Sequence, residues 1–280
     1  MTQVVWYLDK NILERLAYDR RGFDSIIESR GHIVKLVEIE DDGLFPCLEV
    51  EFDQPTVLFG SHEFVKQINH DGRFQPGHLG VNRRTHATQY MSYLPLDWFL
   101  NRDGIFMTWS MFKEYRGIQQ IADHWPEGLF IRPDSGFKTF AGQRVTAADF
   151  DDHVSTLDQI SSVVDDTLIL VNRLSNIEGE FRFVIADKQV IAGSEYRWDG
   201  KLDVRRDWPQ SCWDLAQKVA DHEWQVDIAY TCDVALVDGE PRVVELNGFS
   251  CAGLYACDLE RVVDGVSRAA AREWAGLDLE

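Results

Sequence analysis

Three groups of polar residues in this sequence have the types and spacing that chemistry requires. The first is the segment Val-Val-Glu-Leu-Asn at 243–247, with Asp233 twelve residues before Glu245. In a β-strand Glu245 and Asn247 point to the same face. With Asp233 from a neighbouring strand, they would offer the oxygen ligands that Mg²⁺ prefers. The same residues also fit an ordinary hairpin with one polar, solvent-facing side.

The turn between these two strands decides whether Asp233 can join that face. Asp238-Gly239 is typical of a two-residue hairpin turn. A regular ladder from this turn pairs Asp233 with Val244, places Asp233 and Glu245 on opposite faces, and sends Val244 and Leu246 into the core. A shared metal ion therefore requires either a loop with an odd number of residues or a β-bulge.

The second group lies at the end of an expected strand, 129–132. Arg132-Pro133 is followed by a glycine-bearing loop over 135–142, in which Lys138 stands six residues after Arg132. Two cations and the backbone N–H groups of such a loop suit a polyphosphate, and Ser135 and Gly136 are candidate contacts. The glycines and the lysine are misplaced for a Gly-x-x-x-x-Gly-Lys loop. Alone, the segment is also typical of a loop without function.

The third group is Glu180-Phe181-Arg182 on one expected strand and Tyr196-Arg197 at the end of the next. Glu180 and Arg182 share a face, with Phe181 buried opposite. A pair of arginines binds anionic oxygens and stabilises charge that develops during phosphoryl or acyl transfer. The alternative is a surface ion pair across a sheet, which contributes little to stability.

These groups need a scaffold of strands and helices, and the apolar pattern predicts one. Apolar runs at 4–8, 33–37 and 56–59 alternate with helical patterns, which predicts a parallel sheet covered by helices. No Gly-x-Gly-x-x-Gly follows the first run. A polar stretch over 71–97 would join two lobes. Further helices are expected from Ser110 to Ile121, from a capping box at Thr146 to Ile160, from a cap at Ser211, and over an amphipathic segment from Leu259 to Ala270. Further strands are expected at 167–171, 180–185, 189–192, 232–237 and 242–246.

Composition excludes several classes of protein. The net charge is −19, and residues 207–280 carry five basic against fifteen acidic side chains. This charge opposes binding to a nucleic-acid backbone or to an anionic membrane. No apolar run is long enough to span a bilayer, and the start lacks a secretion-signal pattern. The five cysteines and eight histidines form no disulfide or zinc pattern, so we expect a cytoplasmic protein.

Taken in chain order, the C-terminal groups resemble the ATP-grasp superfamily. Asp233 with Glu245-Leu246-Asn247 is similar to its metal-binding aspartate and Glu-x-Asn strand. Glu180-Phe181-Arg182 is similar to the acidic-x-Arg strand of its ribosomal-protein-modifying glutamate ligases. Tyr196-Arg197 resembles the downstream arginine that holds phosphate.

The central group departs from the usual superfamily pattern in an informative way. The central strand of the superfamily usually ends in Lys-Pro, whereas here it reads Arg132-Pro133 with Lys138 in the loop. This arrangement resembles a largely phage and bacterial clade in which arginine replaces the central lysine and a second lysine follows. The resemblance covers roughly residues 100–260.

The resemblance implies an α/β protein with the ATP-grasp fold. An N-terminal α/β lobe, residues 1–98, would precede a central lobe, 99–170, and a C-terminal lobe, 171–280, and the last two would sandwich ATP. Arg132 and Lys138 would hold the α- and β-phosphates. The remaining nucleotide contacts would be Ser135, Gly136, Val171, Asn172, Arg173, Leu174 and Glu180.

The resemblance also implies the metal and the chemistry. One or two Mg²⁺ ions, with Mn²⁺ as an alternative, would bind Asp233, Glu245 and Asn247. Arg182 and Arg197 would stabilise the transferred phosphoryl group and an acyl phosphate. The expected activity is ATP-dependent joining of a small-molecule or peptide carboxylate to an amine. The alternatives are an ATP-grasp kinase, an acyl-thioester-forming enzyme or a non-catalytic nucleotide-binding protein; the oligomeric state, a dimer included, stays open.

Overall fold

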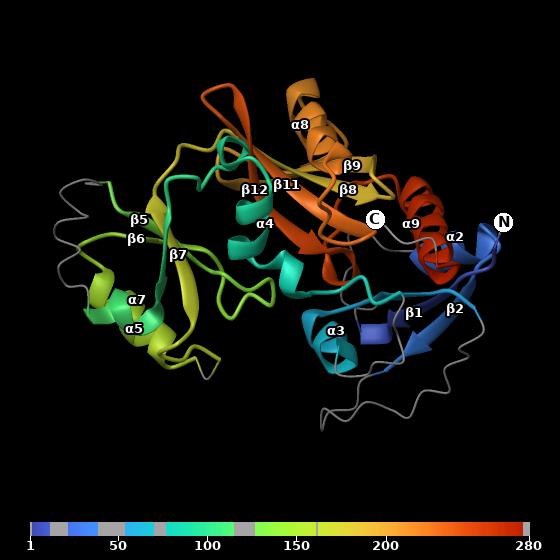
Figure 1. The fold of residues 1–280 in the computed structure, drawn as a ribbon, viewed down its shortest axis with the longest axis horizontal. Coiled ribbons are helices and arrows are strands. Elements are labelled where there is room, and N and C mark those ends of the chain that lie inside the picture. Colours follow the sequence, from blue (N-terminus) through green and yellow to red (C-terminus); the bar gives the residue numbers. More distant parts are fainter. Residues whose placement is uncertain are drawn as a thin grey trace.

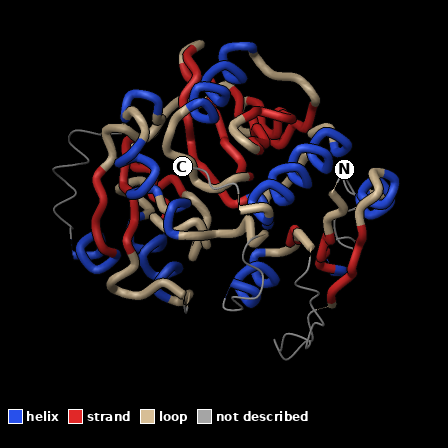
Figure 2. The backbone as a smooth tube through the Cα atoms, turned by 45° about the vertical axis from the view of Figure 1, so that its right-hand side comes forward, coloured by secondary structure: helices blue, strands red, loops and turns tan. Residues whose placement is uncertain are grey.

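The strands of this computed structural model form three separate sheets (Figures 1 and 2). The structure describes residues 2–11, 22–38, 54–69, 77–114, 127–160 and 162–276. The sheets contain three, four and five strands and follow one another in chain order. Among the described residues, no helix is both long and apolar enough to cross a membrane.

The first sheet is parallel, as the alternating pattern predicts. Its strand order is β2-β1-β3, with β1 at Val5–Asp9, β2 at Ile33–Val37 and β3 at Thr56–Phe59. Helix α2 covers Phe23–Ser29 and α3 covers His62–Asn69. Part of the expected first helix, 12–21, lies outside the described residues. The Ser61 hydroxyl accepts the Phe64 N–H, which caps α3 as the sequence predicts.

The stretch over 71–97 is more ordered than a polar connection, where the structure describes it. It contains η2 (Arg83–Thr85), α4 (Ala87–Tyr93) and η3 (Leu96–Trp98). The prediction of a plain linker was wrong because Ala87, Tyr90 and Leu94 follow a helical period. All three are buried against the five-stranded sheet.

The four-stranded sheet has the order β4-β7-β5-β6 and is antiparallel throughout. Its core includes residues of α5 and α7, the two helices that accompany it. Helix α7 begins at Phe150 rather than Thr146, because the Asp149 carboxylate accepts both the N–H and the hydroxyl of Thr146 in the preceding turn. The elements are β4 (Ile105–Thr108), α5 (Trp109–Glu114), β5 (Leu129–Pro133), β6 (Gln143–Val145), α7 (Phe150–Asp158) and β7 (Leu168–Arg173).

The five-stranded sheet has the order β10-β9-β8-β11-β12 and is also antiparallel. Helix α8 begins at Gln210, after Pro209, and not at a Ser211 cap. The elements are β8 (Gly179–Ala186), β9 (Gln189–Trp198), β10 (Lys201–Arg205), α8 (Gln210–Asp221), β11 (Ala229–Val237), β12 (Glu240–Gly248), η5 (Phe249–Cys251) and α9 (Leu259–Trp274).

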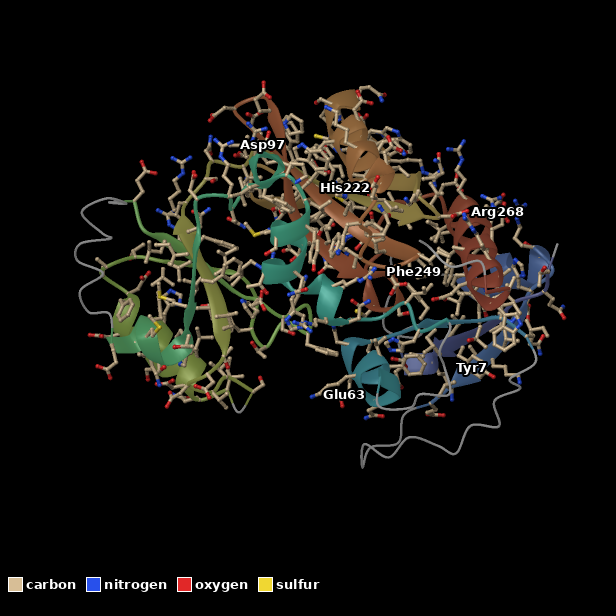
Figure 3. The ribbon with its side chains drawn as sticks, viewed as in Figure 1. Tyr7, Glu63, Asp97, His222, Phe249 and Arg268 are labelled. Atoms are coloured by element: carbon tan, nitrogen blue, oxygen red, sulfur yellow. The ribbon has the colours of Figure 1, made fainter. Side chains whose placement is uncertain are left out.

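The two faces of the five-stranded sheet have different coverings. Along β8, Phe181 and Phe183 point into a core shared with α4 and α8. Val184 and Ala186 point to the other face, into a core shared with α9 and the first sheet. Phe249 belongs to this second core and lies between the N-terminal elements and the large sheet (Figure 3). Glu180 and Arg182, on the same face but nearer the start of β8, instead line a cavity.

Candidate active site

A β-bulge brings the two predicted carboxylates to one face of the sheet. The hairpin of β11 and β12 has the tight turn at Asp238-Gly239, and its ladder is regular up to the pair Val234 and Val243. A register shift then places Asp233 opposite Glu245, not Val244. The condition that the sequence imposed on a shared site is therefore met by a bulge.

The bulge also changes which valine enters the core. Val243 and Leu246 are buried in the core under α4 and α8. Val244, which the regular register assigned to the core, lines the cavity on the opposite face. Its carbonyl accepts an N–H from Arg132 at 3.3 Å. The extra residue thus becomes part of the site.

Three charged residues form a row across β8, β11 and β12. Asp233 lies opposite Arg182 on one side and opposite Glu245 on the other. Arg182 donates two hydrogen bonds to the Asp233 carboxylate, at 2.7 and 2.6 Å. Both side chains of this pair are almost fully buried. Neighbouring strands therefore hold three functional groups side by side.

Glu245 is the meeting point of two cations from the four-stranded sheet and its loop. Arg132 Nη2 lies 3.0 Å from Glu245 Oε2, and Lys138 Nζ donates to Oε1 at 2.8 Å. The Asn247 amide also donates to Oε1. Burial alone would raise the pKa of Glu245, but Arg132 and Lys138 hold it well below its usual range. The two predicted phosphate-binding residues and a predicted metal ligand therefore lie in one network.

Burial acts in the opposite direction at Asp233. It raises the pKa of the Asp233 carboxyl, and the ion pair with Arg182 offsets part of that rise. Around the two carboxylates stand three cations, Arg132, Lys138 and Arg182. This cluster carries an excess of positive charge, which favours an anionic ligand.

The end of β5 is anchored on helix α4. Asp134, which follows Arg132-Pro133, accepts the Thr88 N–H at 2.7 Å and hydrogen bonds from the Thr88 hydroxyl and His86. Burial works against the charge of Asp134, but these hydrogen bonds lower its pKa overall. The connecting helix therefore helps to position Arg132.

A second polar network surrounds Glu180. The Tyr196 hydroxyl donates to its carboxylate at 2.8 Å and Arg197 donates at 2.9 Å. The Tyr196 ring stacks on Tyr255, with centroids 4.9 Å apart, and the Arg182 guanidinium lies close to both rings. Arg182 and Arg197 thus reach the same region from adjacent strands.

A cavity of about 350 Å³ lies between the four-stranded and five-stranded sheets. Its polar end contains the charged row, and its apolar wall contains Phe130, Phe140 and Ile177. A polar end beside an apolar wall is typical of a site for an organic anion. The predicted site residues that line it are Arg132, Lys138, Arg173, Leu174, Glu180, Arg182, Arg197, Asp233 and Glu245.

The other predicted site residues lie elsewhere. Gly136 and Asn247 line a second, adjacent cavity. Ser135 accepts the Phe137 N–H within its own loop. Val171 is buried in the core of the four-stranded sheet, and Asn172 donates to Asn101. Neither Ser135, Val171 nor Asn172 lines either cavity.

Several cavity residues carried no signal that pattern reasoning used. Asn101 comes from the segment before β4, and Tyr255 from the loop after η5. Tyr255 is one of the few non-glycine residues with a left-handed backbone, with φ of 48°. Phe130 and Phe140 read as core aromatics, although Phe130 alternates with the buried Leu129 and Ile131 and so faces the other side of β5.

The donor atoms around Glu245 fit a magnesium ion that takes part of its coordination from phosphate. Asp233, Glu245 and Asn247 offer carboxylate and amide oxygens, the ligand type of Mg²⁺. Among the described residues, no three His, Cys, Asp or Glu side chains converge on a metal position. Two carboxylates and an amide are what an ion with mainly phosphate and water ligands needs.

The sequence matches a protein family over residues 99–265, which covers most of both larger sheets. The family is described as an ATP-grasp domain, family 2 of its clade. Comparison with curated protein sequences finds no match.

Solved structures with the same fold span the whole chain. The D-alanine–D-alanine ligase from Bacillus anthracis has a TM-score of 0.61 at 12% identity, covering 99% of this chain and 100% of the ligase. The D-cycloserine synthetase DcsG has a TM-score of 0.58 at 11% identity, with coverages of 95% and 99%. The ATP-grasp ligase PsnB, complexed with a minimal precursor, has a TM-score of 0.56 at 12% identity, with coverages of 96% and 99%. With the family match over residues 99–265, the chain belongs to the ATP-grasp family.

Proposed function

We propose that this protein is an ATP-dependent ligase that activates a carboxylate as an acyl phosphate and joins it to an amine. The observation that carries the proposal is the row Arg182, Asp233 and Glu245, with Arg132 and Lys138 held on Glu245 at the mouth of one cavity. Family membership and the similar ligases support it. One of these ligases was solved with a precursor peptide, so a peptide substrate is included.

The proposed nucleotide site follows from the position of each charge. ATP would lie in the 350 Å³ cavity, with its base against the apolar wall near Phe130 and the hinge Arg173-Leu174. Arg132 and Lys138 would transfer from Glu245 to the phosphates. Because Arg132 presents two N–H groups at once, to Glu245 and to the Val244 carbonyl, it is built to hold two oxygens together.

The carboxylates that the cations release would then hold the metal. Asp233, Glu245 and Asn247 would bind Mg²⁺, with one or two ions and Mn²⁺ as open alternatives; the ion neutralises charge on the phosphates. Arg182 and Arg197 would stabilise the phosphoryl group as the substrate carboxylate attacks it. Positioning and charge neutralisation are the main contributions of the protein.

The chain's cysteines favour a reducing, cytoplasmic location. The four described cysteines are free thiols, and Cys212, Cys232 and Cys257 are buried. Fold and charge leave the oligomeric state open.

Two substitutions test the catalytic proposal. Glu245→Ala and Asn247→Ala should each abolish Mg²⁺-dependent ATP turnover, whereas far-UV circular dichroism should show a folded chain. Unchanged turnover in both variants would leave only a non-catalytic nucleotide-binding role.

Two binding and trapping measurements separate the alternatives. Mg²⁺ with a nonhydrolysable ATP analogue should raise the melting temperature. Hydroxylamine should trap an acyl phosphate as a hydroxamate, which a kinase that phosphorylates a hydroxyl would not form. Mass analysis of the product with amine and thiol acceptors then distinguishes a ligase from a thioester-forming enzyme.

A further inference from the structure

A second cavity, of about 230 Å³, lies next to the proposed ATP site. Lys138, Arg182 and Tyr255 line both cavities. The rest of its wall comes from separate parts of the chain: His62 at the start of α3, Val81 from the connection, Gly136, the strand end Asn247-Gly248, and residues 251–253. Because Arg182 is shared, an acyl phosphate formed beside it in the first cavity would face the second.

The walls of this cavity determine which charge it accepts. None of the described residues that line it is an aspartate or a glutamate, and two of them, Lys138 and Arg182, are cations. A protonated amine is therefore disfavoured there, and a neutral amine is favoured. An amine that enters as ammonium must lose a proton on the way.

Two residues of the wall have side chains that could take that proton. Burial raises the pKa of the Cys251 thiol to about 11, so Cys251 stays protonated near neutral pH. His62 has the opposite tendency. Loss of water around its ring lowers the pKa of His62, Lys138 and Arg182 lower it further, and Glu245 opposes them. The imidazole is therefore neutral at pH 7 and able to accept a proton.

The local structure holds His62 in place while leaving its ring available. His62 follows Ser61, whose N–H donates to Asp9 and whose hydroxyl caps α3. The cap fixes the first turn of the helix, where His62 is an exposed residue. Within the part of the chain that the structure describes, the imidazole makes no hydrogen bond. A neutral, unpaired imidazole on the wall of a cationic cavity has no structural task in this lobe.

Building on the proposed ligase function, we propose that the second cavity receives the amine acceptor and that His62 is the base that deprotonates it. His62 removes one proton from the ammonium group, and the neutral nitrogen attacks the acyl carbon. The C–N bond forms, the bond from the acyl carbon to the phosphate oxygen breaks, and both electrons leave with phosphate. The second nitrogen proton passes to the departing phosphate, and His62 returns its proton to solvent. An amide, hydrogen phosphate and one proton result.

The choice of nucleophile separates this role from a structural one. Hydroxylamine is already unprotonated near neutral pH and needs no base, whereas an α-amino group is largely protonated. The experiment supplies Mg-ATP and the standard amino acids as both carboxylates and acceptors. It measures hydroxamate formation and amide formation for the wild type and His62→Gln. His153→Gln, on α7 and outside both cavities, is the matched control.

In His62→Gln the ratio of amide to hydroxamate should fall by about 100-fold, the usual contribution of a general base. The rate of amide formation in the wild type should rise with pH through the histidine titration, and the variant should lose that rise. An equal loss of both products, or a pH profile that His62→Gln leaves unchanged, would overturn the role of His62. If the wild type forms no hydroxamate with any carboxylate, the ligase proposal itself fails.

Discussion

Asp233 lies directly opposite Glu245 in the antiparallel ladder of β11 and β12, although the two-residue turn between the strands would pair Asp233 with Val244. The β-bulge accounts for the difference of one residue. It also places the Val244 carbonyl where Arg132 donates to it. A single irregularity thus assembles two carboxylates and one phosphate-binding candidate in one place.

Arg132→Lys should weaken ATP binding while the fold persists. The guanidinium contacts Glu245 and the Val244 carbonyl with different N–H groups, and an ammonium group cannot reproduce that fork. We expect KM for ATP to rise about 10-fold, as for the loss of one charge-assisted hydrogen bond. Arg144→Lys, on the exposed part of β6, is the control and should leave KM unchanged. An unchanged KM in Arg132→Lys would show that charge alone is sufficient.

Asp233→Asn should destabilise the protein, because it leaves the buried Arg182 without its partner. The free energy of unfolding, measured with urea, should fall by about 3 kcal/mol. The double variant Asp233→Asn/Arg182→Gln should recover part of this loss, since the uncompensated charge is gone. Additive losses in the double variant would contradict a coupled pair.

Asp227→Asn should change how stability depends on pH. Burial raises the pKa of Asp227 to about 7, and Glu273 adds to the rise. Between about pH 4 and pH 7 the folded chain keeps this proton while the unfolded chain has lost it, so wild-type stability falls as pH increases.

Asparagine cannot lose that proton and keeps an oxygen for the Ile228 N–H. The variant should therefore show a shallower decline and be more stable at pH 8 by about 1 kcal/mol. Urea unfolding at pH 5 and pH 8 provides the measurement. Parallel pH profiles for the two proteins would refute the raised pKa.

Gly248→Ala should be costly even though its backbone conformation is ordinary. A methyl group there would collide with the Gly80 carbonyl of the connecting segment, which the Ser250 N–H also holds through Leu79. Backbone on both sides must shift, and we expect a loss of about 2 kcal/mol in the free energy of unfolding. At Gly253, on the same cavity, an added methyl meets only ordinary contacts. Gly253→Ala should unfold like the wild type, and equal losses in both would rule out the close approach as the cause.

Local sequence was sufficient for the elements and for the chemical types in the site. Strand alternation predicts the parallel sheet and places Phe181 opposite Arg182, because side-chain direction in a strand depends only on residue parity. The cations at Arg132 and Lys138 and the segment Glu245-Leu246-Asn247 were recognisable as a phosphate and metal pattern for the same local reason.

Tertiary structure decided everything that depends on residues distant in the chain. A bulge cannot be read from a regular turn signal, because its stability comes from neighbours such as Arg132, over a hundred residues away. Helix α4 forms where its apolar side meets the large sheet, and Tyr255 enters the site because it stacks on Tyr196. His62 joins Arg182 in one cavity only when the first sheet packs against the third. Long-range packing selects among local alternatives of similar energy, so these features exist only in the folded chain.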